Sequence, residues 1–217
     1  TFGPKNANLM FRSHLGDLQF LHAMAGADGE PAALTRRRIL AWAEFCWKVA
    51  TGEIGLSQAL RDLQAPDLRE FFGASGWTVQ DLLTLGVPAL RTHIREVAFG
   101  SLLHTLQDSF AAGHVDRASP VADARCAQVP DFAAPGKIRE FHAYGKQDHK
   151  RHAEADTRDA FVSHVLSYRA VHNRVDVKEE QIPHVIGIGR NLVAMLYGER
   201  ALAWAEVRPY LECLFDL

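Results

Sequence analysis

Histidine and aspartate side chains at fixed spacing are the feature of this sequence most able to do chemistry. His104 and Asp108 stand four residues apart, so on a helix both side chains lie on one face. His114 follows shortly after, directly behind Gly113. We expect Gly113 to adopt a left-handed cap conformation that ends the helix and lets His114 turn back toward the pair. Imidazole and carboxylate ligands suit zinc without any thiolate, so this segment predicts a metal site.

The same spacing recurs later in the chain, at His152 and Asp156. Two helices that each present a histidine and a carboxylate one turn apart can enclose metal between them. The alternative for the first set is a buried hydrogen-bonded trio, and the alternative for the second set is a solvated face. We favour metal because burying a carboxylate such as Asp108 is costly unless it is paired or coordinated.

Helices are the elements that must position these residues, because apolar side chains recur at helical spacing and no alternating strand pattern is convincing. The long helix that begins at Pro88 is apolar nearly all round, which predicts a central helix that holds its ligands inside the protein. We therefore predict an all-α fold, a single multi-helix domain over residues 1–217 with a central buried helix carrying metal ligands. Residues 114–135 are expected to form a loop. The expected helices span residues 6–25, 32–50, 57–63, 67–72, 78–85, 88 to the turn at 113, 137–173 with a break near 145, 180–198 and 201–215.

Composition narrows the class of protein. Of the 217 residues 47% are hydrophobic, enough for one sizeable core, and the formal net charge of -2 lacks the basic character of a nucleic-acid binder. No apolar run is long enough to predict a membrane span. The three cysteines, Cys46, Cys126 and Cys213, are odd in number and far apart, so we expect neither a disulfide framework nor a cysteine zinc site. The sequence starts at Thr1, so any targeting signal lies out of view.

The segment Gly100-Ser-Leu-Leu-His104-Thr-Leu-Gln-Asp108-Ser-Phe-Ala-Ala-Gly-His114 resembles the central-helix signature of the zinc-dependent phospholipases C and the related single-strand-specific zinc nucleases. His152-Ala-Glu-Ala-Asp156 looks like that family's later His-x3-Glu/Asp, and Phe11-Arg-Ser-His14 looks like the segment that supplies an earlier zinc histidine. The closing helix, through Leu196-Tyr197 and Trp204, resembles the family's last helix. The resemblance implies an all-helical protein that binds up to three zinc ions and hydrolyses phosphodiesters of lipids or nucleic acids.

The resemblance also implies roles for single residues. Two sets of metal ligands follow from it: His14, His104 and Asp108, then His114, His152 and Asp156. Asp108 would reach from the first zinc toward a neighbouring ion. The family's third site uses a Trp, a His and an Asp upstream of the segment that matches His14, and none of these precedes His14 here. Either a longer protein supplies them or the third site is rebuilt or absent, with Asp17 and His22 as the nearest replacements. The long segment between His114 and His152 contains two histidines that could replace one of these ligands: His142 and His149.

The chemistry that this family implies is metal-assisted hydrolysis by an enzyme. Zinc activates water near neutral pH and stabilises the charge that grows on phosphate oxygens. We expect Asp108 at the reacting centre and Asp17 to orient or deprotonate the water. The near-neutral charge and the glycine-spaced aromatic loop 71–77 favour phospholipid at a membrane surface as the substrate. We predict a zinc phosphodiesterase of phospholipase C type with two zinc ions, secreted or delivered outside the producing cell.

Two other functions stay open at this point. A single-strand-specific zinc nuclease would use the same metal site on nucleic acid. A non-catalytic, zinc-stabilised toxin fragment or binding module would need zinc only to hold its fold, and it would unfold when the metal is removed.

Overall fold

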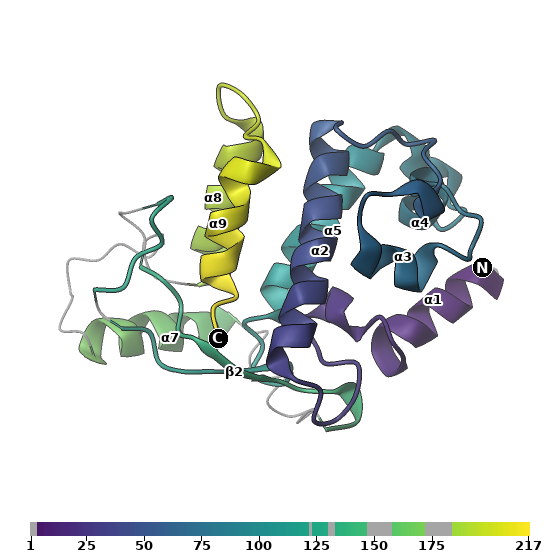
Figure 1. Ribbon diagram of the computed structural model, residues 1–217. Coiled ribbons are helices and arrows are strands. Elements are labelled where there is room, and N and C mark those ends of the chain that lie inside the picture. Colours follow the sequence, from purple (N-terminus) through teal and green to yellow (C-terminus); the bar gives the residue numbers. More distant parts are fainter. Residues whose placement is uncertain (1–3, 122, 130–132, 147–157, 172–183) are drawn as a thin grey trace.

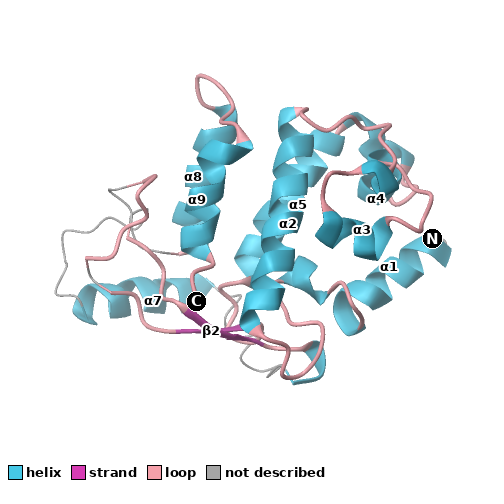
Figure 2. Cartoon of the chain, viewed as in Figure 1, coloured by secondary structure: helices cyan, strands magenta, loops and turns pink. Residues whose placement is uncertain are grey.

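The computed structural model describes residues 4–121, 123–129, 133–146, 158–171 and 184–217. Over this part of the chain the fold is mostly helical with one small two-stranded ribbon, which confirms the all-α class (Figure 2). The α-helices are α1 (Pro4–Leu15), α2 (Ala32–Thr51), α3 (Pro66–Phe72), α4 (Val79–Thr84), α5 (Ile94–Asp108), α7 (Arg158–Val171), α8 (Val185–Tyr197) and α9 (Trp204–Leu214). The shorter elements are the 3-10 helices η1 (Gln19–His22), η2 (Leu60–Asp62), η3 (Pro88–Thr92) and η4 (Tyr144–Lys146) and the strands β1 (Val115–Arg117) and β2 (Ile138–Phe141).

Helices α2 and α5 form the centre of the molecule, with α8 and α9 on one side and α1, α3 and α4 on the other (Figure 1). Helix α2 follows Pro31 and ends where Gly52 adopts a φ of 83°, a conformation that favours glycine. It fills the centre with large side chains, and the indole of Trp47 is fully buried. The main cluster of buried apolar residues runs from Leu18 to Phe215, so both ends of the chain contribute to one core.

The prediction of one continuous helix over residues 6–25 is wrong for its second half. Helix α1 ends just before Gly16, where the chain turns so that the amides of Gly16 and Leu18 both donate to the Arg12 carbonyl, at 3.2 and 2.9 Å. A Cβ atom at position 16 would lie 2.9 Å from the Cα of Arg12, so this turn requires glycine. The chain then continues as η1, which packs against α5. His22 therefore belongs to a different element from His14.

Between α2 and α5, the expected short helices are confirmed at α3 and α4, whereas the segment 57–63 contributes only η2. The Thr78 side chain accepts from the Asp81 amide and the Asp81 carboxylate accepts from the Thr78 amide, so the two residues form a capping box at the start of α4. The helix expected from residue 88 begins as η3 and becomes α-helical only at Ile94. Within the described ranges, no helix combines the length and the apolar character needed to cross a bilayer.

A two-stranded antiparallel ribbon lies where the sequence predicted loop and helix. Strand β1 pairs with β2, with Val115 opposite Phe141 and both side chains buried. The expectation of no strands, and of helix from residue 137, is wrong here because strands of three and four residues are too short to show an alternating pattern. The later expected helices are confirmed over shorter ranges by α7, α8 and α9.

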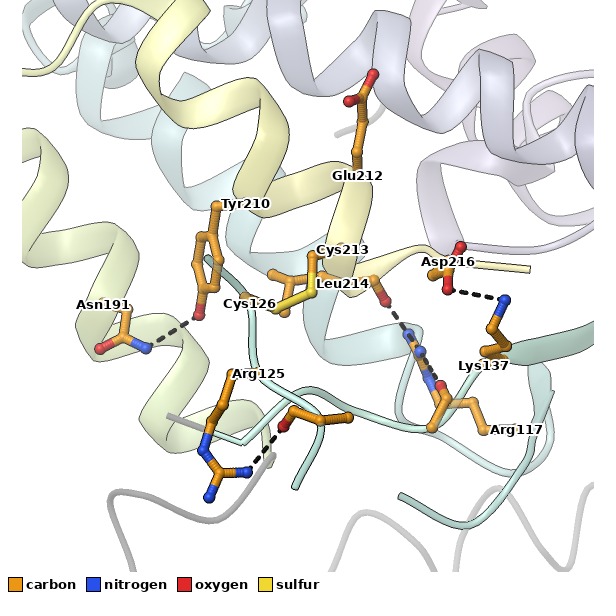
Figure 3. Close-up of a disulfide and its surroundings, with 12 residues drawn as sticks. Arg117, Arg125, Cys126, Lys137, Asn191, Tyr210, Glu212, Cys213, Leu214 and Asp216 are labelled. Carbon is orange, nitrogen blue, oxygen red and sulfur yellow. Dashed lines mark hydrogen bonds and ion pairs between the residues drawn. A yellow bond between two sulfur atoms is a disulfide. The ribbon is translucent and has the colours of Figure 1, made fainter. Parts of the chain in front are cut away.

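A disulfide joins Cys126 to Cys213, which lie 87 residues apart in the sequence (Figure 3). We expected no disulfide framework from three cysteines that are odd in number and far apart in the sequence, and for these two that expectation is wrong, because folding brings the loop after β1 to the C-terminal end of α9. The remaining cysteine, Cys46, is a buried free thiol in α2, and burial raises its pKa. The disulfide thus ties the loop between the two strands to the last helix.

Candidate metal centre

Three donor atoms from two elements meet at the C-terminal end of α5. Nδ1 of His22 lies 2.9 Å from Oδ2 of Asp108 and 3.0 Å from Nε2 of His104. The third side of this triangle, from Nε2 of His104 to Oδ2 of Asp108, is 3.2 Å. Together the three residues could hold a metal ion, and we call them the triad.

The dimensions of the triad suit one face of a tetrahedral zinc site. Ligand bonds of about 2.0–2.1 Å to a tetrahedral ion separate the donor atoms by about 3.3–3.4 Å. The observed separations are shorter than this by about half an ångström or less, which small side-chain movements can supply. Three protein ligands with a fourth position open are typical of catalytic rather than structural zinc.

The triad lies at the surface rather than inside the protein. The sequence predicted that α5 is buried nearly all round, yet 53% of the His104 side chain is exposed, against 17% for Asp108. That prediction is wrong because apolar residues of α5 such as Val97 and Leu103 are only partly buried, and apolar composition does not distinguish them from the core. The exposed edge leaves room for a small molecule to approach the three donor atoms.

Two local features bring the triad together without any ion. Helix α5 presents His104 and Asp108 one turn apart at its C-terminal end, where the partial negative charge of the helix favours a cation. The hydroxyl of Thr105 donates to the Leu21 carbonyl at 2.7 Å, which ties η1 to α5. His22 is therefore held against α5 by a backbone contact of its immediate neighbour.

His114 lies directly beside the triad. Its side chain is almost fully buried, its Nδ1 donates to the His22 carbonyl at 2.8 Å, and the same atom is 3.9 Å from Oδ2 of Asp108. Because a carbonyl can only accept, the neutral ring carries its proton on Nδ1 and its lone pair on Nε2. A backbone carbonyl that orients the ring in this way is typical of metal-ligating histidines.

The turn that brings His114 back is made without the left-handed glycine that the sequence predicted. Gly113 does not adopt a positive φ. Two tight turns follow α5 instead, in which the Ala111 amide donates to the Asp108 carbonyl at 3.0 Å and the His114 amide donates to the Ala111 carbonyl at 2.9 Å. That prediction is therefore wrong in mechanism, although His114 still reaches the vicinity of Asp108.

His14 lies next to the triad but is not one of its members. The centroid of its ring is 4.6 Å from that of His22, and its Nδ1 donates to the Met10 carbonyl at 2.9 Å. The sequence placed His14 with His104 and Asp108 and named His22 only as a replacement for a missing ligand. The helix break at Gly16 is the signal that could have separated the two histidines and brought His22 forward.

Asp17, the predicted partner of the water, is engaged by another side chain. Both of its carboxylate oxygens accept from Arg12, each at 2.7 Å, and this contact lowers the pKa of Asp17 below its ordinary value. A carboxylate held in this way is a weaker base than a free one. A role for Asp17 in orienting or deprotonating water stays a prediction.

The second predicted ligand set is only partly covered by the structure. His152 and Asp156 lie outside the described residues, as does the rival ligand His149. The other rival, His142, follows β2: its amide donates to the His114 carbonyl at 2.7 Å, and its Nδ1 donates to the carbonyl of residue 113 at 3.0 Å. His142 therefore has a ring anchored by a backbone carbonyl, as His114 has.

Comparison with known proteins adds no relative, since no protein-family model, no curated protein and no solved structure matches this chain. The fold and the site by themselves define a mostly helical protein with three converging side chains that could hold a metal ion.

Proposed function

We propose that this protein is a zinc-dependent phosphodiesterase of phospholipase C type, which cleaves phospholipid with metal-activated water. The observation that carries the proposal is the triangle of donor atoms from His22, His104 and Asp108. Two imidazoles and one carboxylate suit zinc, and the exposed edge of the triad leaves a position for water or substrate. The resemblance of the segment 100–114 to the central helix of the zinc phospholipases C supports the same class.

Each residue of the proposed site would have its own role in binding metal. When bound, zinc activates water near neutral pH and offsets the charge that grows on the phosphate oxygens. His22 and His104 would each supply one ring nitrogen, and Asp108 would supply a carboxylate that reaches toward a neighbouring ion. His114 would belong to that second ion, with its ring orientation already fixed by the His22 carbonyl. The remaining ligands of the second ion would be His152 and Asp156.

An exposed apolar face on α1 favours phospholipid over nucleic acid as the substrate. Phe11 and Leu15 are 60% and 55% exposed, and Met10 is exposed as well. These residues share one face of the helix with His14, whose ring lies against that of His22. A substrate with its phosphate at the triad would lie over this neighbouring surface, and acyl chains suit it better than sugars and bases do. Helix α1 also carries no acidic residue that would repel the phosphate.

The first test measures bound zinc, and then hydrolysis of phosphatidylcholine vesicles and of single-stranded DNA, each with and without chelator. We expect about two zinc ions per chain and chelator-sensitive release of phosphocholine. His104→Ala should remain folded and lose the activity. Cleavage of DNA alone would exclude the phospholipase type. Unfolding on removal of zinc, with no activity on either substrate, would instead indicate a structural metal.

A second arm of the same assay tests the apolar face of α1. The double variant Phe11→Ser/Leu15→Ser should lose activity severalfold on vesicles but keep its activity on a soluble short-chain phosphodiester. Val121→Ser is the control, because Val121 is at least as exposed as Phe11 and Leu15 but lies in the loop after β1. Equal losses in the two variants would remove this support for a lipid substrate.

We also propose that the protein acts outside the producing cell. Disulfides form and persist in oxidising compartments, and the Cys126–Cys213 pair supports such a destination. Recovery of the oxidised protein from the culture medium of the producing cells would be the expected result, and retention in the reducing cytosol would contradict it.

A further inference from the structure

Arg117 bridges the C-terminal ends of α5 and α9. Its Nε donates to the Ser109 carbonyl at 2.9 Å, and its Nη2 donates to the Ser109 hydroxyl at 3.0 Å. Its Nη1 donates to the Gly136 carbonyl at 3.1 Å and to the Leu214 carbonyl at 2.9 Å, the second of which is drawn in Figure 3. The guanidinium also lies over the ring of Phe110, 4.6 Å from its centroid. One side chain thus joins the residues after α5 to Gly136, two residues before β2, and to the end of α9.

The groups that accept hydrogen bonds from Arg117 at these positions are neutral. All four acceptors are carbonyl or hydroxyl oxygens, and the carbonyls at the C-terminus of a helix carry partial negative charge that favours a cation. Burial lowers the pKa of Arg117 to about 9, so the side chain keeps its charge at neutral pH. Such a group holds its acceptors firmly, because each one would lose a charge-assisted hydrogen bond if it moved.

We infer that Arg117 is a positioning residue for the candidate metal centre. It fixes Ser109 and Phe110, the two residues that follow Asp108, and so sets the direction in which Asp108 faces His22 and His104 and in which His114 faces Asp108. The inference rests on the proposed metal site. Groups that orient metal ligands without touching the ion contribute to metal affinity, and their removal typically weakens it about ten- to a hundredfold.

Arg36 offers a matched control for this role. Its Nε donates to the Phe215 carbonyl at 2.7 Å, and its Nη2 donates to the Glu212 carbonyl at 3.1 Å. Arg36→Met and Arg117→Met therefore both remove a guanidinium from the end of α9, but only Arg117→Met also releases Ser109. Any effect that comes from loosening α9 should appear in both variants, whereas an effect on the metal ligands should appear only in Arg117→Met.

The first measurement is the zinc dissociation constant of each variant, by competition with a chromophoric chelator. Arg117→Met should weaken zinc binding about ten- to a hundredfold, and Arg36→Met should stay within about twofold of the wild type. Arg117→Lys should fall between them, because an ammonium group reaches fewer of the four oxygens. Wild-type affinity in Arg117→Met, or an equal loss in Arg36→Met, would overturn the inference.

The second measurement needs no metal. The amides of Ala111, His114 and Val115 close the turns that follow α5, and their hydrogen exchange reports how firmly this segment is held. We expect exchange at these amides to be at least about tenfold faster in Arg117→Met than in the wild type, and to be unchanged in Arg36→Met. If Arg117→Met fails to fold, Arg117→Lys carries the same comparison. A wild-type protein that binds no zinc would refute the metal site itself, whereas zinc binding with unchanged exchange in the Arg117 variants would overturn only the role of Arg117.

Discussion

Replacing His22 by alanine should abolish tight metal binding, whereas replacing His14 by alanine should not. Nδ1 of His22 takes part in the two shortest sides of the donor triangle, 2.9 Å to Asp108 and 3.0 Å to His104. The ring of His14 instead lies beside His22, at 4.6 Å between centroids, with its Nδ1 bound to the Met10 carbonyl. These two variants decide which histidine completes the ligand set.

The size of the effect follows from the number of ligands removed. A four-ligand structural zinc site binds with about 10–16 kcal/mol, so each ligand contributes about 2.5–4 kcal/mol. At about 1.4 kcal/mol for each factor of ten, His22→Ala should weaken zinc binding by about two to three orders of magnitude. His14→Ala removes a ring that touches one ligand but supplies none of the three donor atoms, so its effect should not exceed about tenfold.

The assay is a competition titration against a chelator of known affinity near neutral pH, with far-ultraviolet circular dichroism to verify that each variant is folded. Wild-type affinity in His22→Ala would refute the geometry of the triad. A loss of the same size in His14→Ala would return His14 to the ligand set that the sequence suggested. A loss confined to His22→Ala is the result that we expect.

Two further predictions concern stability. Replacing both Cys126 and Cys213 by serine should lower the free energy of unfolding by about 2–5 kcal/mol, because the disulfide closes 87 residues of chain and restricts the unfolded state; an unchanged midpoint in urea would contradict this. Asp17→Asn should remove a pH-dependent contribution, since Arg12 lowers the pKa of Asp17 in the fold and the resulting stability is present above the ordinary value of 3.8 and lost as the pH falls through the lower folded value. Urea unfolding at a series of pH values should therefore show the advantage of the wild type shrinking only below about pH 4, and a constant difference would argue against the pairing with Arg12.

Local spacing is sufficient to predict the part of the site that lies on one helix. His104 and Asp108 stand one turn apart, and helix geometry alone brings their side chains together, as the distance of 3.2 Å confirms. The helical class and the capping box at Thr78 follow in the same way from patterns within a few residues. Each of these features depends on neighbours along the chain.

Features that depend on distant contacts could not be read from the same patterns. His22 comes close to His104 and Asp108 because helix α1 ends before Gly16 and because the Thr105 hydroxyl on α5 donates to the carbonyl of Leu21. The strands β1 and β2 and the disulfide likewise arise from tertiary placement of a loop with little periodicity. The exposure of His104 belongs to the same group, since apolar composition says how much of α5 can be buried but not which side faces a neighbour.

The triad and the disulfide close the chain twice, one after the other. His22 and His104 lie 82 residues apart, and the second closure, from Cys126 to Cys213, begins only after the first has ended. The two closures do not overlap in the sequence, so the chain contains two successive segments whose ends are held together. The ends of the first are held by side chains that could bind a metal ion, and the ends of the second by a covalent bond. Arg117 lies in the short stretch between them, and its contacts with Ser109 and Leu214 connect the end of the molecule that carries the triad to the end that carries the disulfide.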